Sequence, residues 1–225
     1  MDLIVKGKTK DVYDLGAGNL LIKFKDDMTG EDGKFDPGAN TVGLTVKGAG
    51  RGGLKLTDYF FRKINEAGYA THFVTADIEK AEMVVKRAEK FGKGLEVICR
   101  FVAYGSFIKR YGDLTEEGKP LDALVEVTIK ADERGDPPIS ADTLAMLGIL
   151  SLEEYEVIKS LTQKVSGIIR DILKAKSMDL YDIKFEFGRI GSDIVIIDEI
   201  SGGCMRVFKD GKPVDPMELV DLVLN

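Results

Sequence analysis

Charged side chains alternate with apolar ones in the sequence DIKFEF, which begins at Asp182. Because strand side chains point alternately to opposite faces, Asp182, Lys184 and Glu186 are expected to share one face. The next apolar run ends in Asp198. A hairpin turn centred on Gly191 would pair Lys184 with Asp198 and place Glu186 diagonally across from that acid.

Diagonal neighbours on antiparallel strands lie about 7 Å apart. Two carboxylates at that separation, Glu186 and Asp198, suit one Mg²⁺ ion, with phosphate oxygens and water completing its shell. The pattern therefore predicts a magnesium site. The alternative is a solvated strand face that carries a surface ion pair.

A second candidate site is the sequence GKTKDVY, which begins at Gly7. Glycine allows close approach of a ligand to the backbone, and Lys8 and Lys10 would share one face of a strand. Two ammonium groups on one face can hold a polyphosphate. An exposed edge strand with two solvated lysines is the alternative.

A third candidate site joins a predicted strand to a turn that contains Gly105 and Ser106. Arg100, Ser106 and the amides of the turn are suited to a phosphomonoester, because the arginine fork binds two oxygens at once. An ordinary strand–turn–helix connection is the alternative.

Composition limits the kinds of partner. The chain has 225 residues, a formal net charge of −6 and a pI near 5.1, so a broad positive field for nucleic acid is not expected. No segment approaches the roughly 18 apolar residues of a membrane span, and a signal-peptide pattern is absent. Two cysteines and one histidine, His72, favour neither a disulfide framework nor a multi-histidine metal site. We expect a cytoplasmic protein, with His72 packed inside a strand.

The hydrophobic periodicity predicts an α+β protein. Residues 1–25 favour strands, and residues 26–53 are predicted to form a long functional loop. Helices are predicted at 57–67 and at 152–175, the second opened by a capping box. The other predicted elements are strands at 69–74, 95–102, 124–130, 181–187 and 193–200 and a helix at 216–223.

A boundary between two lobes is predicted near residues 86–94, where glycine and lysine are frequent. It would divide the chain into a β-rich N-terminal lobe, residues 1–90, and a C-terminal α/β lobe, residues 91–225.

Five segments of the chain resemble, in the same order, those of the SAICAR synthetase family. They are GKTKDVY from residue 7, DMTGEDG from residue 27, RFVAYGSFIKR from residue 100, YDIKFEFG from residue 181 and IDEISGGCMR from residue 197. Each segment is short, but the ordered set is specific. Two positions depart from the family pattern: Gly202-Gly203 stands where Pro-Asp is usual, and Phe101 replaces a usual Asn.

The resemblance implies an ATP- and magnesium-dependent ligase of purine biosynthesis. The reaction would join L-aspartate to the carboxylate of carboxyaminoimidazole ribonucleotide (CAIR), giving SAICAR, ADP and phosphate. The resemblance also implies a kinase-like N-terminal ATP lobe, an active site in the cleft between the lobes, and a homodimer.

The resemblance also assigns residues to roles. Those implied to bind the nucleotide and its metal are Lys8, Lys10, Glu186 and Asp198, the last two as magnesium ligands. Those implied to bind CAIR are Arg100, Ser106, Asp136, Asp182, Lys184 and Arg206. Those implied to act in catalysis are Lys10, Asp27, Lys130, Lys184 and Asp198. No covalent enzyme intermediate is needed, so rate enhancement would come from positioning and electrostatics.

Two other functions fit parts of the pattern. A kinase-like enzyme acting on another small molecule would keep Lys10, Glu186 and Asp198 but would not need the phosphate site at Arg100 and Ser106. A non-catalytic nucleotide-binding regulator would accommodate the departure at Gly202-Gly203.

Overall fold

The computed structural model describes residues 1–39 and 41–225 and has a mixed α+β fold. Contacts divide the chain into two compact units. The first unit comprises Met1–Ala88, Glu199–Cys204 and Val214–Asn225, and the second comprises Glu89–Asp198 and Met205–Pro213. The lobes at 1–90 and 91–225 stay a prediction. Residue 40, within the predicted loop, lies outside the described residues.

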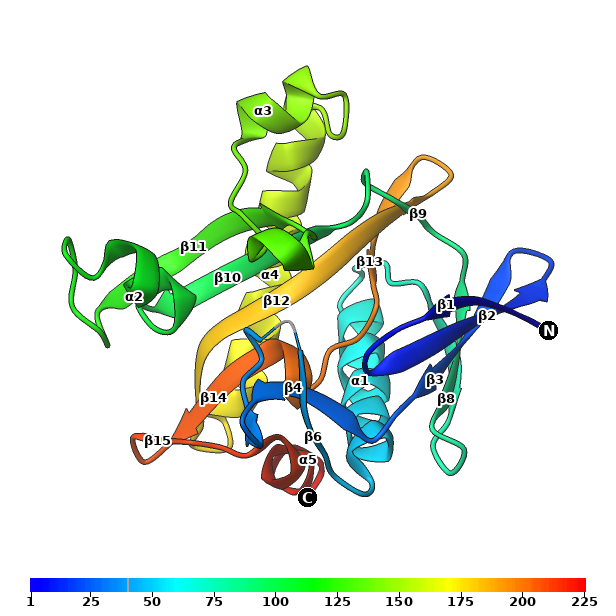
Figure 1. The fold of residues 1–225 in the computed structure, drawn as a ribbon, viewed down its shortest axis with the longest axis horizontal. Coiled ribbons are helices and arrows are strands. Elements are labelled where there is room, and N and C mark those ends of the chain that lie inside the picture. Colours follow the sequence, from blue (N-terminus) through cyan, green and yellow to red (C-terminus); the bar gives the residue numbers. More distant parts are fainter. Residues whose placement is uncertain (40) are drawn as a thin grey trace. The chain divides into compact units, whose positions relative to one another are not determined.

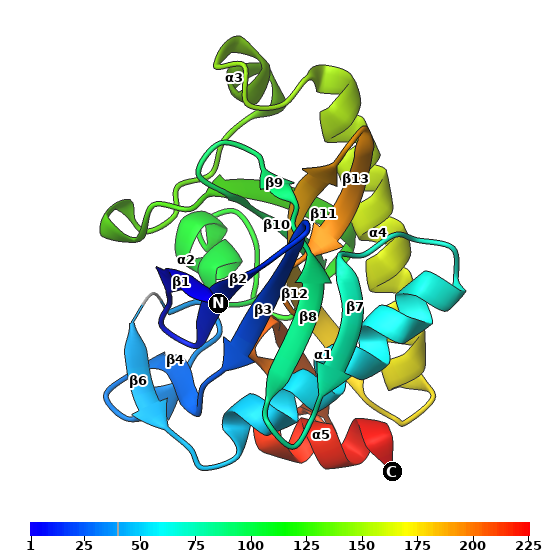
Figure 2. The same ribbon diagram turned by 90° about the vertical axis from the view of Figure 1, so that its right-hand side faces the viewer.

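The first unit is built around a five-stranded antiparallel sheet in the order β1-β2-β3-β8-β7. These strands are β1 (Asp2–Lys6), β2 (Lys10–Gly16), β3 (Asn19–Phe24), β7 (Phe73–Asp77) and β8 (Glu82–Lys86). A smaller sheet, in the order β5-β4-β6, contains β4 (Asp27–Glu31), β5 (Lys34–Phe35) and β6 (Val42–Thr45). Helix α1 (Ala49–Glu66) packs against β3 and β7 and also contacts α5 (Pro216–Leu224), as Figure 2 shows.

Helix α1 begins eight residues earlier than the sequence indicates, inside the segment predicted to be a loop. The prediction was wrong because Gly50, Gly52 and Gly53 are poor helix formers, and tertiary contacts outweigh that preference. Asp26 accepts hydrogen bonds from the backbone N–H groups of Gly48 and Gly50, at 3.0 and 3.1 Å. A Cβ on Gly50 would lie 2.7 Å from the carbonyl oxygen of Lys25, so glycine permits this close approach.

The departure from the family pattern at Gly202-Gly203 has a packing explanation. These residues form the short 3₁₀ helix η2 (Gly202–Cys204), which contacts α5 within the first unit. A Cβ on Gly202 would lie 2.8 Å from Pro216 Cβ and 2.9 Å from Pro216 Cα. A residue with a side chain therefore does not fit at position 202 unless α5 moves.

We expect Gly202→Ala to lower the free energy of unfolding by about 1–3 kcal/mol, the cost of forcing an extra carbon into a packed contact. Gly203→Ala is the matched control, because its Cβ would meet only the Ser201 hydroxyl, at 3.2 Å. Urea unfolding of both variants measures the difference. Equal stability of the two variants would contradict this explanation.

The second unit is built around a seven-stranded sheet whose main path is β11-β10-β12-β14-β15, with β13 and β9 also paired to β12. The strands are β9 (Glu89–Lys90), β10 (Leu95–Val102), β11 (Pro120–Ile129), β12 (Asp179–Ile190), β13 (Asp193–Ile197), β14 (Met205–Lys209) and β15 (Lys212–Pro213). The helices are α2 (Ser106–Tyr111), η1 (Asp132–Arg134), α3 (Ala141–Met146) and α4 (Leu152–Lys174). Helix α4 lies along the sheet and contacts β10, β11 and β12 (Figure 1).

The core of the second unit forms between α4 and the apolar face of β12. Ile183, Phe185 and Phe187 of β12 are at most 1% exposed, as expected from their alternation with charged residues. The predicted capping box of α4 is confirmed: Ser151 Oγ accepts from the N–H of Glu154, and Glu154 accepts from the N–H of Ser151. Because the apolar side chains of β12 are packed in this core, its charged side chains must point away from α4, on the other face of the sheet.

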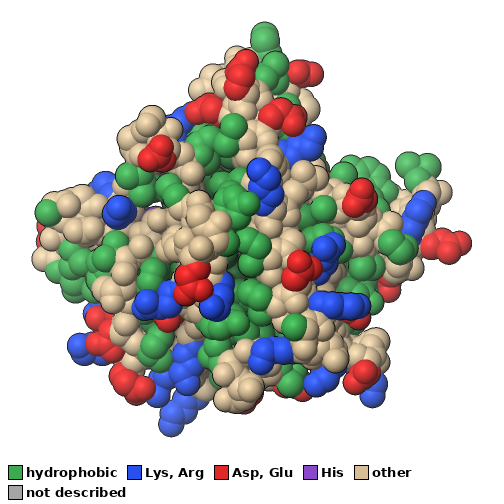
Figure 3. Space-filling model, turned by 180° about the vertical axis from the view of Figure 1, so that it is seen from behind, with side chains coloured by type: hydrophobic (Ala, Val, Ile, Leu, Met, Phe, Trp, Pro, Cys, Tyr) green, Lys and Arg blue, Asp and Glu red, His purple; other side chains and the backbone are tan. Residues whose placement is uncertain are grey.

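His72, Cys99, the helices and the surface charge each bear on which functions are possible. His72 is 4% exposed and packs edge-on against Phe61, which confirms a packed histidine. The strand predicted at 69–74 begins only at Phe73, so His72 lies in the bend before β7 and not inside a strand. Burial raises the pKa of the Cys99 thiol to about 11, which keeps it a protonated core residue. No helix in the described part of the chain combines the length and apolar character that crossing a bilayer requires. Acidic and basic side chains are interspersed on the face in Figure 3.

Candidate active site

One face of β10, β11 and β12 carries a group of charged residues. Arg100 lies directly opposite Asp182, Ile98 opposite Lys184, and Glu96 opposite Glu186. Directly opposite residues project from the same face of a sheet. The structure thus places Asp182, Lys184 and Glu186 together, as the alternation predicted, and adds Glu96, which sequence reasoning missed.

Glu96 and Glu186 form a pair of like charges that lysines offset. Two carboxylates directly opposite each other on adjacent strands repel. Lys184 donates to Glu96 Oε1 at 2.7 Å, and Lys130 donates to Glu186 Oε1 at 2.6 Å. Both carboxylates are buried, at 8% and 6% exposure for the residues. The four side chains form an alternating arrangement of charge, which we call the Lys–Glu cluster.

Asp198 is part of the same electrostatic environment. Burial by itself lowers the pKa of Lys130, but attraction by Glu186 and Asp198, with a smaller contribution from Glu96, outweighs burial and raises it. The stem of Lys130 passes over Gly94, where a Cβ would lie 3.0 Å from Lys130 Cδ. Lys130, Glu186 and Asp198 are therefore brought together, as required of three predicted site residues.

The predicted hairpin register was wrong by one residue. Glu186 pairs with Ile197, because the connecting turn contains two residues, Gly191 and Ser192, rather than centring on Gly191. Lys184 is therefore not the partner of Asp198. A shift of one residue reverses the face of a strand side chain, but Asp198 lies beyond the end of β13 with a φ of 69°. The chain bends there, so strand alternation does not apply to Asp198.

The Lys184 ammonium offers a test of the Lys–Glu cluster through pH. Burial lowers its pKa, but attraction by Glu96 and the hydrogen bond that Lys184 donates to it, helped by attraction by Glu186, outweigh burial and raise the pKa. The stabilisation from this lysine is then fully present below its unfolded-chain pKa of about 10.4 and is lost as pH rises through the folded value.

We expect the difference in unfolding free energy between wild type and Lys184→Met to stay constant from about pH 7 to 9 and to shrink above about pH 10.4. Urea unfolding at a series of pH values measures it. Lys164→Met, at an exposed position of α4, is the control. A difference that already falls between pH 7 and 9 would contradict the raised pKa.

Glu186 of the Lys–Glu cluster and the nearby Asp198 fit the chemistry of a magnesium site. Glu186 and Asp198 supply oxygen ligands, which Mg²⁺ prefers, and both act on the same ammonium group. Among the side chains that the structure describes, no group of three or more His, Cys, Asp or Glu residues is arranged to hold a metal. Mg²⁺ takes one or two protein carboxylates and completes its shell with phosphate oxygens and water.

A second cluster lies further along the same sheet, around Asp182. Arg206 of β14 lies opposite Asp182 and donates to both of its carboxylate oxygens, at 3.1 and 3.0 Å. Arg100 donates to Asp182 Oδ2 at 3.3 Å and to Ser106 Oγ at 3.0 Å. Arg100, Ser106 and Arg206, predicted to hold a phosphate, are thus brought together, and we call this group the arginine cluster.

Gly105 makes room for the arginine cluster. It precedes α2 with a φ of 57°, a conformation that favours glycine. A Cβ at this position would lie 3.0 Å from the guanidinium carbon of Arg206. The turn therefore brings its backbone against Arg206, as the predicted phosphate site requires.

Lys10 and Lys8 occupy different local structures in the first unit. Lys10 is the first residue of β2 and pairs with Glu199 at 2.5 Å, a partner that sequence reasoning missed. Lys8 lies in the bend before β2, so the two lysines do not share a strand face as predicted. Gly7 makes that bend possible, since a Cβ there would lie 2.5 Å from the carbonyl oxygen of Lys10.

Asp27 and Asp136 are not joined to the two clusters by their own contacts. Asp27, in β4, accepts a hydrogen bond from Thr45 Oγ1 at 2.7 Å. Asp136 has a φ of 45° and accepts from the N–H of Ala131 at 2.6 Å, which closes the loop after β11. Within the described residues, neither carboxylate makes a hydrogen bond or ion pair with another predicted site residue.

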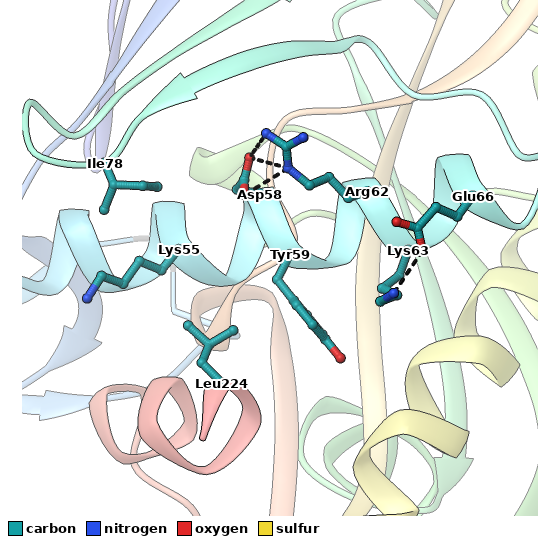
Figure 4. A pocket seen from close by; sticks show the side chains of 8 residues that line it. All are labelled: Lys55, Asp58, Tyr59, Arg62, Lys63, Glu66, Ile78 and Leu224. Carbon is teal, nitrogen blue, oxygen red and sulfur yellow. Dashed lines mark hydrogen bonds and ion pairs between the residues drawn. The ribbon is translucent and has the colours of Figure 1, made fainter.

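A cavity of about 430 Å³ lies in the first unit along α1 and beside Leu224 of α5 (Figure 4). Its lining is largely charged, and ion pairs join Arg62 to Asp58 and Lys63 to Glu66. None of the residues that line it is a predicted site residue. The cavity therefore shares no residue with the candidate site.

Comparisons with known proteins show to which family the chain belongs. Residues 3–218 match the family model described as SAICAR synthetase. A phosphoribosylaminoimidazole-succinocarboxamide synthase of Clostridium tetani is 57% identical over 227 residues, which cover 100% of both chains. One of Methanopyrus kandleri is 37% identical over 211 residues, or 92% of this chain and 80% of its own.

Solved structures give the same result. A SAICAR synthetase (Type-2) in complex with ADP has a TM-score of 0.83 and 32% identity, covering 94% of this chain and 87% of that one. A SAICAR synthetase from Pyrococcus horikoshii OT3 has a TM-score of 0.80 and 33% identity, covering 92% and 87%. An α+β fold with these relatives and this charged sheet face is that of a ligase. The chain belongs to the SAICAR synthetase family, whose reaction is a step of purine biosynthesis.

Proposed function

We propose that this chain joins L-aspartate to the carboxylate of CAIR at the expense of ATP, producing SAICAR, ADP and phosphate. The observation that carries the proposal is the Lys–Glu cluster with Asp198 beside the arginine cluster on one sheet. The relative in complex with ADP supports ATP as the nucleotide. An acidic pair for a metal and an arginine-rich site for a phosphate are what the three anionic substrates require.

The chemistry must turn a carboxylate into an acyl donor. An oxygen of the CAIR carboxylate attacks the γ-phosphorus of ATP, and ADP leaves. The amine of L-aspartate then attacks the carboxyl carbon, phosphate departs with its bond to that carbon broken, and the amine nitrogen loses a proton. Each step brings anions together, so fixed cations that offset repulsion supply most of the rate enhancement.

The side chains of this chain divide that work. Arg100, Ser106 and Arg206 bind the 5′-phosphate of CAIR, since they converge around one carboxylate and present guanidinium donors. Lys184 and Asp182 lie beside them on the same face and orient the rest of CAIR.

The remaining roles concern the nucleotide and the substrate pocket. Lys8 and Lys10 contact the nucleotide phosphates, and Lys130 offsets charge as phosphate is transferred. Asp27 and Asp136 belong to the substrate pocket.

Glu186 and Asp198 are the residues that would hold Mg²⁺, in keeping with their oxygen donors and shared ammonium partner. When bound, the ion neutralises phosphate charge and orients the nucleotide. Lys130 of the cluster attracts both carboxylates and holds Glu186 in place through its hydrogen bond.

The test is substrate dependence. Purified protein with Mg²⁺ should release ADP only when CAIR and L-aspartate are both present. Transfer of phosphate to a stable product would favour a kinase-like enzyme, and ATP binding without turnover would favour a regulator. Either result from folded protein would reject the proposed reaction.

We also propose a cytoplasmic homodimer that binds no nucleic acid. The formal net charge of −6 supports the last point, because nucleic-acid binding rests on a positive field. Size-exclusion chromatography with light scattering tests the dimer. The mass of a monomer at micromolar concentration would exclude it.

A further inference from the structure

Five charged side chains form a continuous alternating row in the second unit. Its order is Arg110, Glu126, Arg100, Asp182 and Arg206. Three positive and two negative groups leave a net charge of +1, from the formal charges of these residues. Glu126, in β11, is the one member that neither the sequence motifs nor the proposed reaction assigns.

Glu126 contacts both arginines on its side of the row. Its Oε2 accepts a hydrogen bond from Nε of Arg100. Arg110 Nη2 donates to both of its oxygens, at 2.7 and 2.8 Å. The Glu126 side chain is 13% exposed, so water screens these contacts little. One carboxylate therefore connects a buried arginine to a more exposed one.

The contact with Glu126 occupies one of the few hydrogen-bond donors of the buried Arg100 guanidinium. Its side chain is 1% exposed, and a guanidinium has five N–H donors. In the described part of the chain three of them are used: Nε by Glu126, Nη1 by Asp182 and Nη2 by Ser106. The two remaining donors lie on the Nη atoms. Glu126 fixes the Nε side, so the donors that remain are those of the two Nη atoms.

We propose that Glu126 is a positioning residue that holds Arg100 and Arg110 in the orientation that binds the 5′-phosphate of CAIR. This inference rests on the proposed function and adds a residue to its phosphate site. Glu126 does not touch the phosphate, and it acts through the two arginines.

Two physical effects oppose each other in a substitution of Glu126. Removing its negative charge raises the net charge of the row and favours an anion. Removing its hydrogen bonds frees two arginine side chains that would then repel each other and would no longer point at the ligand. For a buried guanidinium the loss of a charge-assisted hydrogen bond is the larger effect. The sign of the change in KM therefore decides between the two roles.

Steady-state kinetics of Glu126→Gln, with CAIR as the varied substrate, provide the test. We expect the KM for CAIR to rise about tenfold or more, as for loss of one charge-assisted hydrogen bond, with kcat and the KM for ATP within about twofold. Asp122→Asn is the matched control, since Asp122 is an exposed carboxylate on the same strand. A KM that is unchanged or lower in Glu126→Gln overturns the inference.

Glu126→Asp separates charge from reach. It keeps the negative charge but is one methylene shorter, so it cannot bridge both arginines. A positioning role predicts a raised KM in this variant as well, and wild-type KM in Glu126→Asp overturns it. This variant also keeps the test open if the glutamine variant fails to fold.

A binding measurement distinguishes failure of this inference from failure of the proposed reaction. Ribose 5-phosphate serves as the probe, by calorimetric titration of the full chain without ATP. We expect weaker binding to Glu126→Gln than to wild type and to Asp122→Asn, whether or not CAIR is the true substrate. Equal binding to all three proteins overturns the role of Glu126 even if the ligase reaction is confirmed.

Discussion

Glu186→Gln is expected to reduce kcat by about 10²–10³-fold, the range seen when one preorganised electrostatic group is removed from an active site. The substitution keeps the size of the side chain but removes its charge. Glu186 is buried and accepts a hydrogen bond from the Lys130 ammonium at 2.6 Å. The variant therefore loses a proposed magnesium ligand and the charged partner of Lys130. We expect the magnesium concentration for half-maximal activity to rise together with the fall in kcat.

Asp179→Asn provides the matched control for that experiment. Asp179 is an exposed carboxylate on the same strand, β12, and it also pairs with a lysine, Lys174, at 3.2 Å. Its loss removes one charge from the strand without touching the charged face. A Glu186→Gln enzyme that keeps wild-type kcat and magnesium dependence would exclude this carboxylate as a metal ligand.

Arg100→Met is expected to have the largest effect on stability. The guanidinium is buried against Glu126, Asp182 and Ser106. Removing one partner of a buried charged pair costs about 3–5 kcal/mol, because the remaining charge stays buried without its counterion. We expect a loss of that order in the free energy of unfolding, and a KM for CAIR raised well beyond that of Glu126→Gln.

Arg100→Lys should fall between wild type and Arg100→Met, since one ammonium cannot serve three partners in a fork geometry. Arg170→Met is the control, because Arg170 is exposed on α4 and stacks over Phe101. Urea unfolding and CAIR kinetics on the same preparations separate stability from binding. Wild-type stability in Arg100→Met would mean that the buried network contributes nothing to folding.

Local patterns predicted the elements that carry the site. The alternation in DIKFEF placed Asp182, Lys184 and Glu186 on one face, and the pairing of β10 with β12 confirmed it. The strand predicted at 95–102 and the helix predicted at 152–175 match β10 and α4 closely. These successes share a cause, since period-2 and period-3.6 patterns reflect burial of one face.

What local patterns missed depends on contacts between distant residues. Glu96, Glu126 and Glu199 each pair with a basic residue at least 26 positions away. A single acidic residue in a strand carries no signal that it faces a lysine across the sheet. The register of β12 with β13 failed for a related reason, because the number of residues in a tight turn decides which pairs meet. The early start of α1 depended on Asp26 and on packing that allows its glycines.

Strand β12 is hydrogen-bonded along both edges, to β10 and β9 on one side and to β14 and β13 on the other. Its paired amide hydrogens are therefore expected to exchange slowly, because exchange requires opening of the neighbouring strands. The side chains of this strand that are proposed to bind substrate are therefore attached to backbone that is expected to exchange slowly. Ligand-driven adjustment must then come from side-chain rotamers and neighbouring loops, while the strand itself stays a fixed reference for the reacting groups.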